Sequence, residues 1–362
     1  MADNIQFRRD LAANWRTYNT LLPIGSPGFE TDTRLFKIGD GTTTWNTLPY
    51  ANLPDTTLAG GRLSIYQGLP VALPNPGFFN PTPPTILYYV PYTSNLITLW
   101  TPGVGWRTRS FDTTTAVSLI GRPANTNYDV FASDVNGSVQ LSLVAWVDDW
   151  TRTALPGCSS AGIIQHQGVM VQCGNAANRY LGTVRTSAAG GSTQDNFWRR
   201  FVYNYSNQVM TTTYWYHSIP HTYSAGYWRR WDSGGYGDAV QQAQGVNKLQ
   251  VVLGAPTTIF MKTFAYTRYG NTAPMIYGYA TQRANPALWN NVAPDGDFTG
   301  YPDQTVNAID PVPLGGQSIM TQNTASTIGR NTVGLVEFWM AQFGYTSNSW
   351  FYSAAINADI LM

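Results

Sequence analysis

The pattern of apolar and polar positions in the first 50 residues predicts one short helix and short strands joined by tight turns. Residues 5–9 (IQFRR) alternate as a strand does. Asp10 can cap a helix that runs from Leu11 to about Asn19, with Leu11, Trp15 and Tyr18 on one face. A unit of about 50 residues with no disulfide or metal buries too little surface to fold comfortably alone. We therefore expect it to complete its core against copies of itself or a neighbour.

A second stretch of this unit, ETDTRLFKIGDGTTTW at residues 30–45, places one strand between two turn-rich polar clusters. Asp32 and Thr33 can turn the chain through their own side-chain hydrogen bonds. Residues 35–38 supply the strand, and Gly39-Asp40-Gly41 allows positive φ where the chain reverses. Trp45 ends the stretch with an aromatic side chain that caps a small apolar cluster.

The rest of the chain shows the alternation of an antiparallel β protein. Residues 86–111 predict two or three strands, and residues 128–147 predict a hairpin that turns at Asn136-Gly137. Residues 168–185 predict another hairpin, and residues 199–209 an aromatic strand that bends into a loop. Residues 51–62 have the composition of a linker, and residues 68–84 that of a stiff proline-rich loop.

The composition also favours a mainly β fold. Charged residues make up only 11% of the chain, with Lys at three positions (37, 248, 262) and Glu at two (30, 337), so two good helix formers are nearly absent. The length of 362 residues suits two or three domains. We expect a small α+β head followed by an antiparallel β-sandwich or jelly-roll-like region. The predicted parts are a head at 1–52, a linker and proline-rich segment at 53–84, a β domain at 85–235, and a distal β domain at 236–362 that could continue it.

Residues 5–50 resemble the N-terminal module shared by bacteriophage tail fibres and tropism-determinant proteins. The family pattern is an Arg, then a Trp, then L-x-x-G-E-x-G-x-E-T-D-T-x-x-x-K-x-G-D-G-x-T-x-W. This chain follows it in order, except that Ser26 stands where the family often has Glu. In that family the module trimerises and attaches a fibre to the virion. The resemblance therefore implies assembly and attachment for Arg9, Trp15, Glu30, Asp32, Thr33, Phe36, Lys37, Ile38, Gly39, Asp40, Gly41 and Trp45.

A looser resemblance covers residues 63–353. The order YDVF, AWVDD, GVMVQ, NRYLGTVRT, RRFVYNYSNQV is similar to a β module near the distal ends of phage fibre and appendage proteins. The stretch GLVEFWMAQFGYTSNSWFYS at 334–353 resembles its continuation. The sequence has no internal repeat, heptad pattern or low-complexity tract, which favours a compact knob or short spike over a long fibre.

These resemblances imply a phage virion appendage that forms a homotrimer, docks to other virion proteins by its head and contacts a glycan or protein receptor on the host. We expect no enzymatic activity and no cofactor. The alternatives are a capsid decoration or head-fibre protein, and a polysaccharide depolymerase. The N-terminus lacks the apolar segment of a signal peptide, and no run reaches the roughly 18 apolar residues that span a bilayer. We expect a virion protein made in the host cytoplasm, without membrane insertion.

Few residues suggest metal or catalytic chemistry. His217 and His221 have the i, i+4 spacing of helical zinc ligands, but Pro220 and strand-like flanks argue against a helix. Glycoside cleavage needs two carboxylates about 5–10 Å apart, and Asp148-Asp149 would point to opposite faces of a strand. The stretch APDGDFTGYPD reads as a turn, or alternatively as a calcium loop built from Asp295, Asp297 and Asp303.

Aromatic residues, at 14% of the chain, suggest sugar binding. Flat apolar rings match the C–H faces of sugars, and neighbouring polar groups can fix the hydroxyls. The alternative, which the expected trimer favours, is burial of the rings between subunits. The candidate glycan contacts are Tyr214, Trp215, Tyr216, Trp228 and Trp231.

A net charge of +1 with scattered signs offers no footprint for duplex nucleic acid, so we expect no nucleic-acid partner. The pairs Arg199-Arg200 and Arg229-Arg230 are flanked by aromatics. Stacking on a single strand is conceivable, but arginines on aromatics inside a β-rich interface are favoured. Cys158 and Cys173 are close enough in sequence to pair, although nothing in the sequence requires a disulfide.

Overall fold

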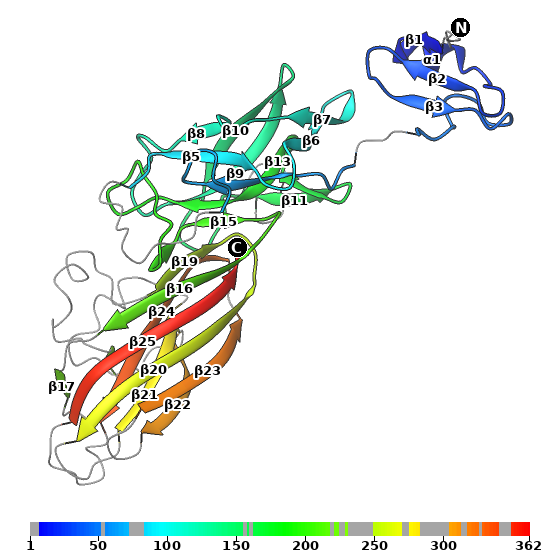
Figure 1. The fold of residues 1–362 in the computed structure, drawn as a ribbon. Coiled ribbons are helices and arrows are strands. Elements are labelled where there is room, and N and C mark those ends of the chain that lie inside the picture. Colours follow the sequence, from blue (N-terminus) through cyan, green and yellow to red (C-terminus); the bar gives the residue numbers. More distant parts are fainter. Residues whose placement is uncertain are drawn as a thin grey trace, which may run out of the picture.

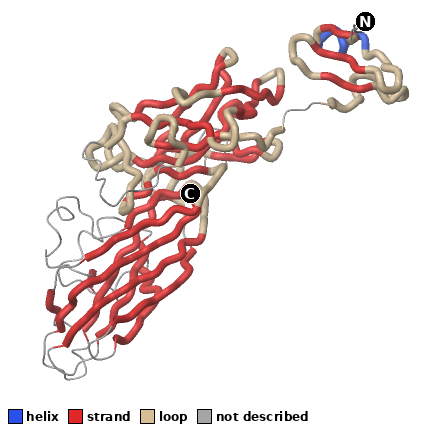
Figure 2. Tube along the Cα trace, viewed as in Figure 1, coloured by secondary structure: helices blue, strands red, loops and turns tan. Residues whose placement is uncertain are grey.

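The computed structural model describes residues 7–51, 55–71, 83–154, 158, 162–217, 221–223, 229–230, 249–269, 275–282, 304–312, 317–325, 328–339 and 349–362. Three β-rich units follow one another in space: a head at the N-terminal end, a middle unit, and a distal unit (Figure 1). The C-terminus lies where the middle and distal units meet. Strands dominate (Figure 2), which confirms the mainly β fold. Among the described residues, no helix has the length and apolar character needed to cross a bilayer.

The head (residues 7–51) packs one helix against a three-stranded sheet of order β1-β2-β3. The helix α1 (Ala12–Tyr18) confirms the predicted helix, but Leu11 rather than Asp10 is its N-cap residue. Asp10 instead accepts hydrogen bonds from the Leu11 N–H and the Asn14 amide. The strand β1 pairs parallel with β2, and β2 pairs antiparallel with β3. The strands are β1 (Arg8–Asp10), β2 (Pro27–Glu30) and β3 (Phe36–Ile38).

The middle unit (β4–β13 and β15) is built from two layers. One is the sheet β10-β9-β13-β12-β11, with β15 beside β13, and the other comprises β4-β5-β8 and β6-β7. Buried Leu, Val, Ile and Tyr side chains from both layers form one core. The predicted hairpins are confirmed, and Asn136 and Gly137 both have positive φ, as their turn requires. The strands are β4 (Gly61–Ser64), β5 (Ile86–Pro91), β6 (Leu96–Thr101), β7 (Gly105–Ser110), β8 (Ala116–Ser118), β9 (Asn127–Val135), β10 (Ser138–Ala145), β11 (Ile163–His166), β12 (Val169–Gln172), β13 (Asn175–Arg185) and β15 (Val202–Asn204).

The prediction of a linker at residues 51–62 is wrong for the second half of that segment, which packs against the middle unit. The strand β4 begins at Gly61 and is fully buried. Just before it, the buried Arg179 guanidinium donates hydrogen bonds to the carbonyls of Thr56, Thr57 and Leu58. Arg179, which is far from this polar segment in the sequence, therefore holds the segment against the middle unit. Most of the predicted proline-rich loop (72–82) lies outside the described residues.

The distal unit (β14 and β16–β25) is a jelly roll. Its sheets have the orders β16-β25-β20-β23 and β14-β19-β24-β21-β22. From β19 onward, successive strands alternate between the two sheets. The exception is the pair β21 and β22, which are neighbours in one sheet. This order is that of an eight-stranded jelly roll. The strands are β14 (Arg199–Arg200), β16 (Met210–His217), β17 (His221–Tyr223), β18 (Arg229–Arg230), β19 (Leu249–Leu253), β20 (Thr258–Tyr269), β21 (Met275–Gln282), β22 (Gln304–Val312), β23 (Gln317–Ala325), β24 (Gly329–Trp339) and β25 (Ser349–Leu361).

Strand pairing places the boundary between the middle and distal units nearer the N-terminus than the sequence predicts. The expected boundary lies at residue 235, but β16 pairs along its whole length with β25, the last strand. The change from one unit to the other therefore falls near residue 209. Alternation along residues 199–217 could not show this, because the partner strand lies more than 130 residues away.

The two cysteines form a disulfide. Cys158 and Cys173 are paired, with a Cα–Cα distance of 6.1 Å. Cys173 follows β12 directly, so the bond ties the segment after β10 to the β12–β13 turn. This decides a pairing that the sequence left open.

Candidate functional site

The signature residues of the head surround a buried ion and hydroxyl cluster. Glu30 is completely buried, and its carboxylate accepts hydrogen bonds from the Tyr50 hydroxyl (2.6 Å) and from the Thr33 hydroxyl. Lys37 is buried too; its Nζ donates to the Trp45 carbonyl at 2.6 Å and lies 4.2 Å from the Tyr50 ring centroid. Burial lowers the pKa of Lys37 and raises the pKa of Tyr50 to about 12. Because buried charges are costly without partners, these groups fix one another's positions.

Two tryptophans form the centre of the small head core. The rings of Trp15 and Trp45 stack with centroids 4.1 Å apart, and Trp15 Nε1 donates to the Phe29 carbonyl at 3.0 Å. Gly28 lies directly beneath them, since a Cβ there would come within 2.6 Å of Trp45 Cζ3. The glycine of the family pattern is therefore needed for close approach of the strand to the rings.

The aspartates of the pattern stabilise turns. Asp40 Oδ1 accepts hydrogen bonds from the backbone N–H groups of Thr42 (2.8 Å) and Thr43 (2.6 Å). The hydrogen bond from the Thr43 hydroxyl and these two backbone bonds hold the pKa of Asp40 well below its usual range. Asp32 accepts from the Ala12 N–H at 2.9 Å and so ties the helix start to the β2–β3 turn. These predicted site residues build the head rather than project from it.

Among the described residues of the head, the other face of the sheet is partly exposed. Register places Arg9, Phe29 and Phe36 side by side, opposite in direction to Gly28 and Lys37, which face the core. Phe7 and Ile38 lie on the same side by alternation and are 57% and 48% exposed. We call this surface, made of Phe7, Arg9, Phe29, Phe36 and Ile38, the open face. Other exposed apolar residues of the head are Leu11, Tyr18, Leu21 and Ile24.

Removing the Tyr50 hydroxyl should destabilise the head measurably. In Tyr50→Phe, the buried Glu30 carboxylate loses one of its two hydroxyl donors, which we expect to cost about 1–3 kcal/mol of unfolding free energy. Tyr18→Phe is the matched control, because that side chain is mostly exposed. Chemical denaturation followed by tryptophan fluorescence measures both variants. Equal stability of the two would show that the Tyr50–Glu30 bond contributes nothing.

The head touches the middle unit through the β6–β7 hairpin. Arg107 Nη1 donates to the Thr33 carbonyl at 2.5 Å. Beside this contact is a cavity of about 300 Å³, lined by Glu30 and Tyr50 of the head and by Trp100 and Trp106 of the hairpin. The signature cluster therefore also lies at the joint between the two units.

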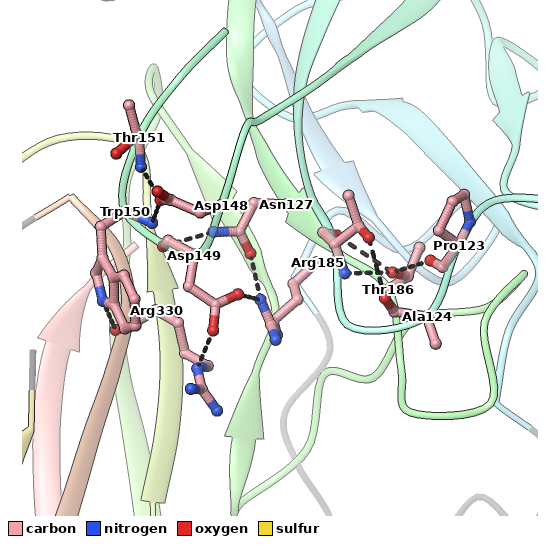
Figure 3. A network of polar contacts seen from close by, with 11 residues as sticks. Pro123, Ala124, Asn127, Asp148, Asp149, Trp150, Thr151, Arg185, Thr186 and Arg330 are labelled. Atoms are coloured by element: carbon pink, nitrogen blue, oxygen red, sulfur yellow. Dashed lines mark hydrogen bonds and ion pairs between the residues drawn. The ribbon is translucent and has the colours of Figure 1, made fainter. Parts of the chain in front are cut away.

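A second junction joins the middle and distal units through Asp149 (Figure 3). Its carboxylate forms ion pairs with Arg185 of β13 and, at 2.9 Å, with Nε of Arg330 of β24. Arg185 also donates to Asn127 Oδ1 at 2.8 Å. Burial lowers the pKa of both arginines, and the charge of Asp149 opposes that shift. Two cations from separate units therefore share one carboxylate.

The sequence pattern predicts a strand at Asp148 and Asp149, and the structure corrects this. Both residues lie in a turn after β10, not on a strand. Asp148 Oδ1 accepts from the backbone N–H groups of Trp150 (2.7 Å) and Thr151 (2.6 Å). Because Asp149 is engaged by two arginines and Asp148 caps the turn, their structural roles account for both carboxylates. No sequence signal could pair Asp149 with Arg330, which lies 181 positions away.

The remaining sequence candidates are only partly visible. His217 ends β16 and His221 begins β17, so both lie on strands, as their flanks predicted. Tyr214, Trp215 and Tyr216 lie in β16. Outside the described residues are Trp228, Trp231, Asp295, Asp297 and Asp303.

The arginine pairs lie in β14 and β18. Arg199 donates to Gln194 and Gln250, whereas Arg200 contacts Asp195 at 3.2 Å. These three side chains, which contact Arg199 and Arg200, are polar and belong to the same β-rich junction.

Comparison with known proteins addresses the head directly. Residues 5–43 match the family model described as the major tropism determinant N-terminal domain. A search of curated proteins finds no match to the chain.

Among solved structures, the major tropism determinant I1 variant aligns at 11% identity with a TM-score of 0.25, covering 68% of this chain and 56% of that one. The M1 variant aligns at 13% identity with a TM-score of 0.24, covering 68% and 55%. The structure of infectious bursal disease virus Gx strain aligns at 13% identity with a TM-score of 0.26, covering 86% and 74%. The chain thus spans little more than half the length of the tropism determinants it aligns with. The family match confirms the resemblance seen in the signature residues: residues 5–43 are similar to the major tropism determinant N-terminal domain.

Proposed function

We propose that this protein is a structural, receptor-binding component of a bacteriophage virion. In this proposal it is a homotrimer that docks to the particle by its head and contacts the host surface with its distal unit. The observation that carries the proposal is a tropism-determinant N-terminal domain whose sheet keeps one apolar face open. The mechanism is multivalent adhesion, in which several weak contacts per particle give firm attachment.

The open face supports self-association of the head. Among the described residues, the hydrophobic cluster inside the head contains four buried residues, Trp15, Leu22, Trp45 and Leu48. A core of this size is marginal for an isolated unit. Phe7 and Ile38, which would complete a larger core, point away from it and are about half exposed. Three heads packed by their open faces would bury this surface around one axis.

The distal unit supports host contact without catalysis. Jelly rolls occur in viral capsid and lectin domains, where binding rather than bond cleavage is the usual task. The candidate glycan contacts Tyr214, Trp215 and Tyr216 lie in its strand β16. The one carboxylate pair that the structure describes in full, Asp148-Asp149, has structural partners. A capsid decoration protein with the same head is the second candidate, since the jelly roll is equally suited to that role.

Charging the open face should dissociate the trimer. In the double variant Phe7→Glu, Ile38→Glu, carboxylates would have to be buried between heads, so we expect the mass to fall from three chains to one. The Trp15–Trp45 core is untouched, so the head should remain folded. The matched control is Ala13→Glu, which adds a carboxylate to the exposed side of α1. Light scattering measures the mass. A monomeric wild-type chain at high concentration, or a trimeric double variant, would refute self-association through this face.

Imaging of labelled particles tests the docking and separates the two candidates. A label on the distal unit should appear at the tail tip of an adhesin and on the capsid of a decoration protein. Incubation of the purified protein with host capsule or lipopolysaccharide tests the depolymerase alternative, because release of reducing ends would overturn the non-enzymatic proposal.

A further inference from the structure

A cavity of about 320 Å³ lies where the middle unit meets the distal unit. Its volume falls at the lower end of the range of about 300–1,000 Å³ found for small-molecule sites. The walls come from β4 and the loop after it, from the segment around β14, and from the start of β16. The residues that matter below are Arg62, Tyr66, Asp195, Phe197, Arg200 and Met210.

One of the two arginines in this cavity is fully engaged. Arg62 is 5% exposed and donates through Nε to the Pro70 carbonyl, through Nη1 to the Asn207 carbonyl and through Nη2 to the Met362 carbonyl. Every nitrogen of its guanidinium therefore has a backbone acceptor. Arg62 fixes the shape of the cavity and has no nitrogen left without an acceptor for a ligand.

Arg200 differs from Arg62 in having an ion-pair partner but no hydrogen-bond acceptor, among the described residues, at two of its three nitrogens. It is 6% exposed, and its Nε lies 3.2 Å from Asp195 Oδ1, an ion-pair contact without hydrogen-bond geometry. Within the described part of the chain, neither Nε nor Nη1 has a hydrogen-bond acceptor. Buried guanidinium N–H groups are normally bonded, and each exception calls for an explanation such as an absent ion or ligand.

The neighbouring arginine shows that this arrangement is not a general property of the strand. Arg199 points to the other side of β14 and donates to Gln194 at 2.7 Å and to Gln250 at 3.3 Å. Two adjacent arginines thus have different surroundings: Arg199 has neutral acceptors in place, whereas Arg200 lies beside the cavity with the Asp195 ion pair. The difference singles out Arg200 as the arginine of the pair whose Nε and Nη1 have no hydrogen-bond acceptor in the described part of the chain.

Apolar side chains form the rest of the wall. The Tyr66 ring is 37% exposed and Met210 is 57% exposed, while Phe197 is half-buried. The hydroxyls of Ser64 and Thr211 on the same wall already donate to backbone carbonyls. The cavity therefore offers an aromatic and apolar surface next to two arginines and one carboxylate, Asp195, a net positive wall that suits a ring bearing an acidic group.

We propose that this cavity binds the carboxylate or phosphate group of an acidic saccharide, with Arg200 donating to the anion and Tyr66 and Phe197 packing against the sugar ring. The saccharide carrier rests on the proposed receptor role, whereas the oxyanion site rests only on Arg200 and the cavity. The site lies between the two units, away from the head, so it is independent of trimer formation.

Titration calorimetry on the full-length protein tests the proposal with glucuronate, glucose 6-phosphate and glucose as probes. We expect glucuronate or glucose 6-phosphate to bind and glucose not to bind. Which acid binds more tightly distinguishes a carboxylate source from a phosphate source. Arg200→Gln should weaken binding roughly tenfold or more, as expected for loss of charge-assisted hydrogen bonds. Arg199→Gln, which removes the same charge one residue away, should leave the affinity unchanged.

Tyr66→Ala serves as a second variant, since it truncates an exposed ring at the cavity wall and does not depend on Arg200→Gln folding. We expect several-fold weaker binding of the acidic sugar, with an unchanged melting temperature. Absence of binding to the wild type at millimolar probe, equal binding by Arg200→Gln, or equal binding of glucose would each overturn the site. The trimer mass and particle labelling remain separate measurements, so failure here would leave the proposed attachment role standing.

Discussion

Replacing Asp149 by alanine is expected to lower the unfolding free energy by about 3–5 kcal/mol, the usual effect of removing one partner of a buried ion pair. Arg185 and Arg330 are 2% and 9% exposed, and both would keep a buried charge without its carboxylate. Because the two arginines belong to different units, the loss should fall on the junction between them. We expect the middle and distal units of this variant to unfold in separate steps, whereas the wild type unfolds them together.

Asp148→Ala is the matched control for this experiment. It removes a neighbouring carboxylate that caps the same turn but pairs with no arginine, so we expect a loss of only about 1 kcal/mol. Differential scanning calorimetry measures both variants at equal concentration. If Asp149→Ala and Asp148→Ala were equally stable, the carboxylate would be a turn residue like its neighbour and the junction would be held by other contacts. The bond from Arg152 Nη2 to the Gly254 carbonyl would be the next candidate.

Replacing Trp45 by alanine is expected to unfold the head. Truncation of a fully buried tryptophan costs about 3–5 kcal/mol, and the described hydrophobic cluster of the head has four buried residues, Trp45 among them. The stack on Trp15 and the ring beneath Lys37 would both disappear. Hydrogen exchange measured by mass spectrometry should show fast exchange throughout residues 7–51, with unchanged protection in the middle and distal units.

Tyr18→Ala separates this effect from a general loss of aromatic surface. That ring is 72% exposed, so we expect a change within about 0.5 kcal/mol and native exchange rates in the head. If Trp45→Ala kept native protection in residues 7–51, the tryptophan stack would not be the centre of the head core. If the head unfolded but the trimer persisted, assembly would have to depend on the distal units rather than on the open face.

Local signals in the sequence were sufficient for much of the head. The spacing of Leu11, Trp15 and Tyr18 predicts α1, which the structure places at Ala12–Tyr18. Asp40 and Gly41 predict a turn, and the structure gives the Asp40 carboxylate two backbone donors and Gly41 a φ of +75°. These features depend on neighbours within four residues, so a sequence can show them. The resemblance named the same residues as an attachment site, but it could not show that Glu30 and Lys37 face inward.

Antiparallel hairpins were equally predictable, because Asn136-Gly137 and the flanking alternation lie in one stretch of chain. Strand partners far apart in sequence were not. The expected boundary at residue 235 was misplaced because β16 pairs with β25, and the expected linker was misjudged because Arg179 reaches Thr56 from another strand.

The sequence by itself determined the β-rich character of this protein, its turns, and the resemblance of residues 5–43 to the tropism-determinant module. Each of these follows from residue types and short spacings. The tertiary structure decided the jelly-roll order, the sharing of Asp149 between Arg185 and Arg330, and the exposure of the open face. It also decided which arginine of the pair Arg199-Arg200 lacks acceptors. These properties depend on which side chains the fold brings together, such as Asp149 with Arg330, and the free energy that selects such contacts comes from burial, which only the folded arrangement defines.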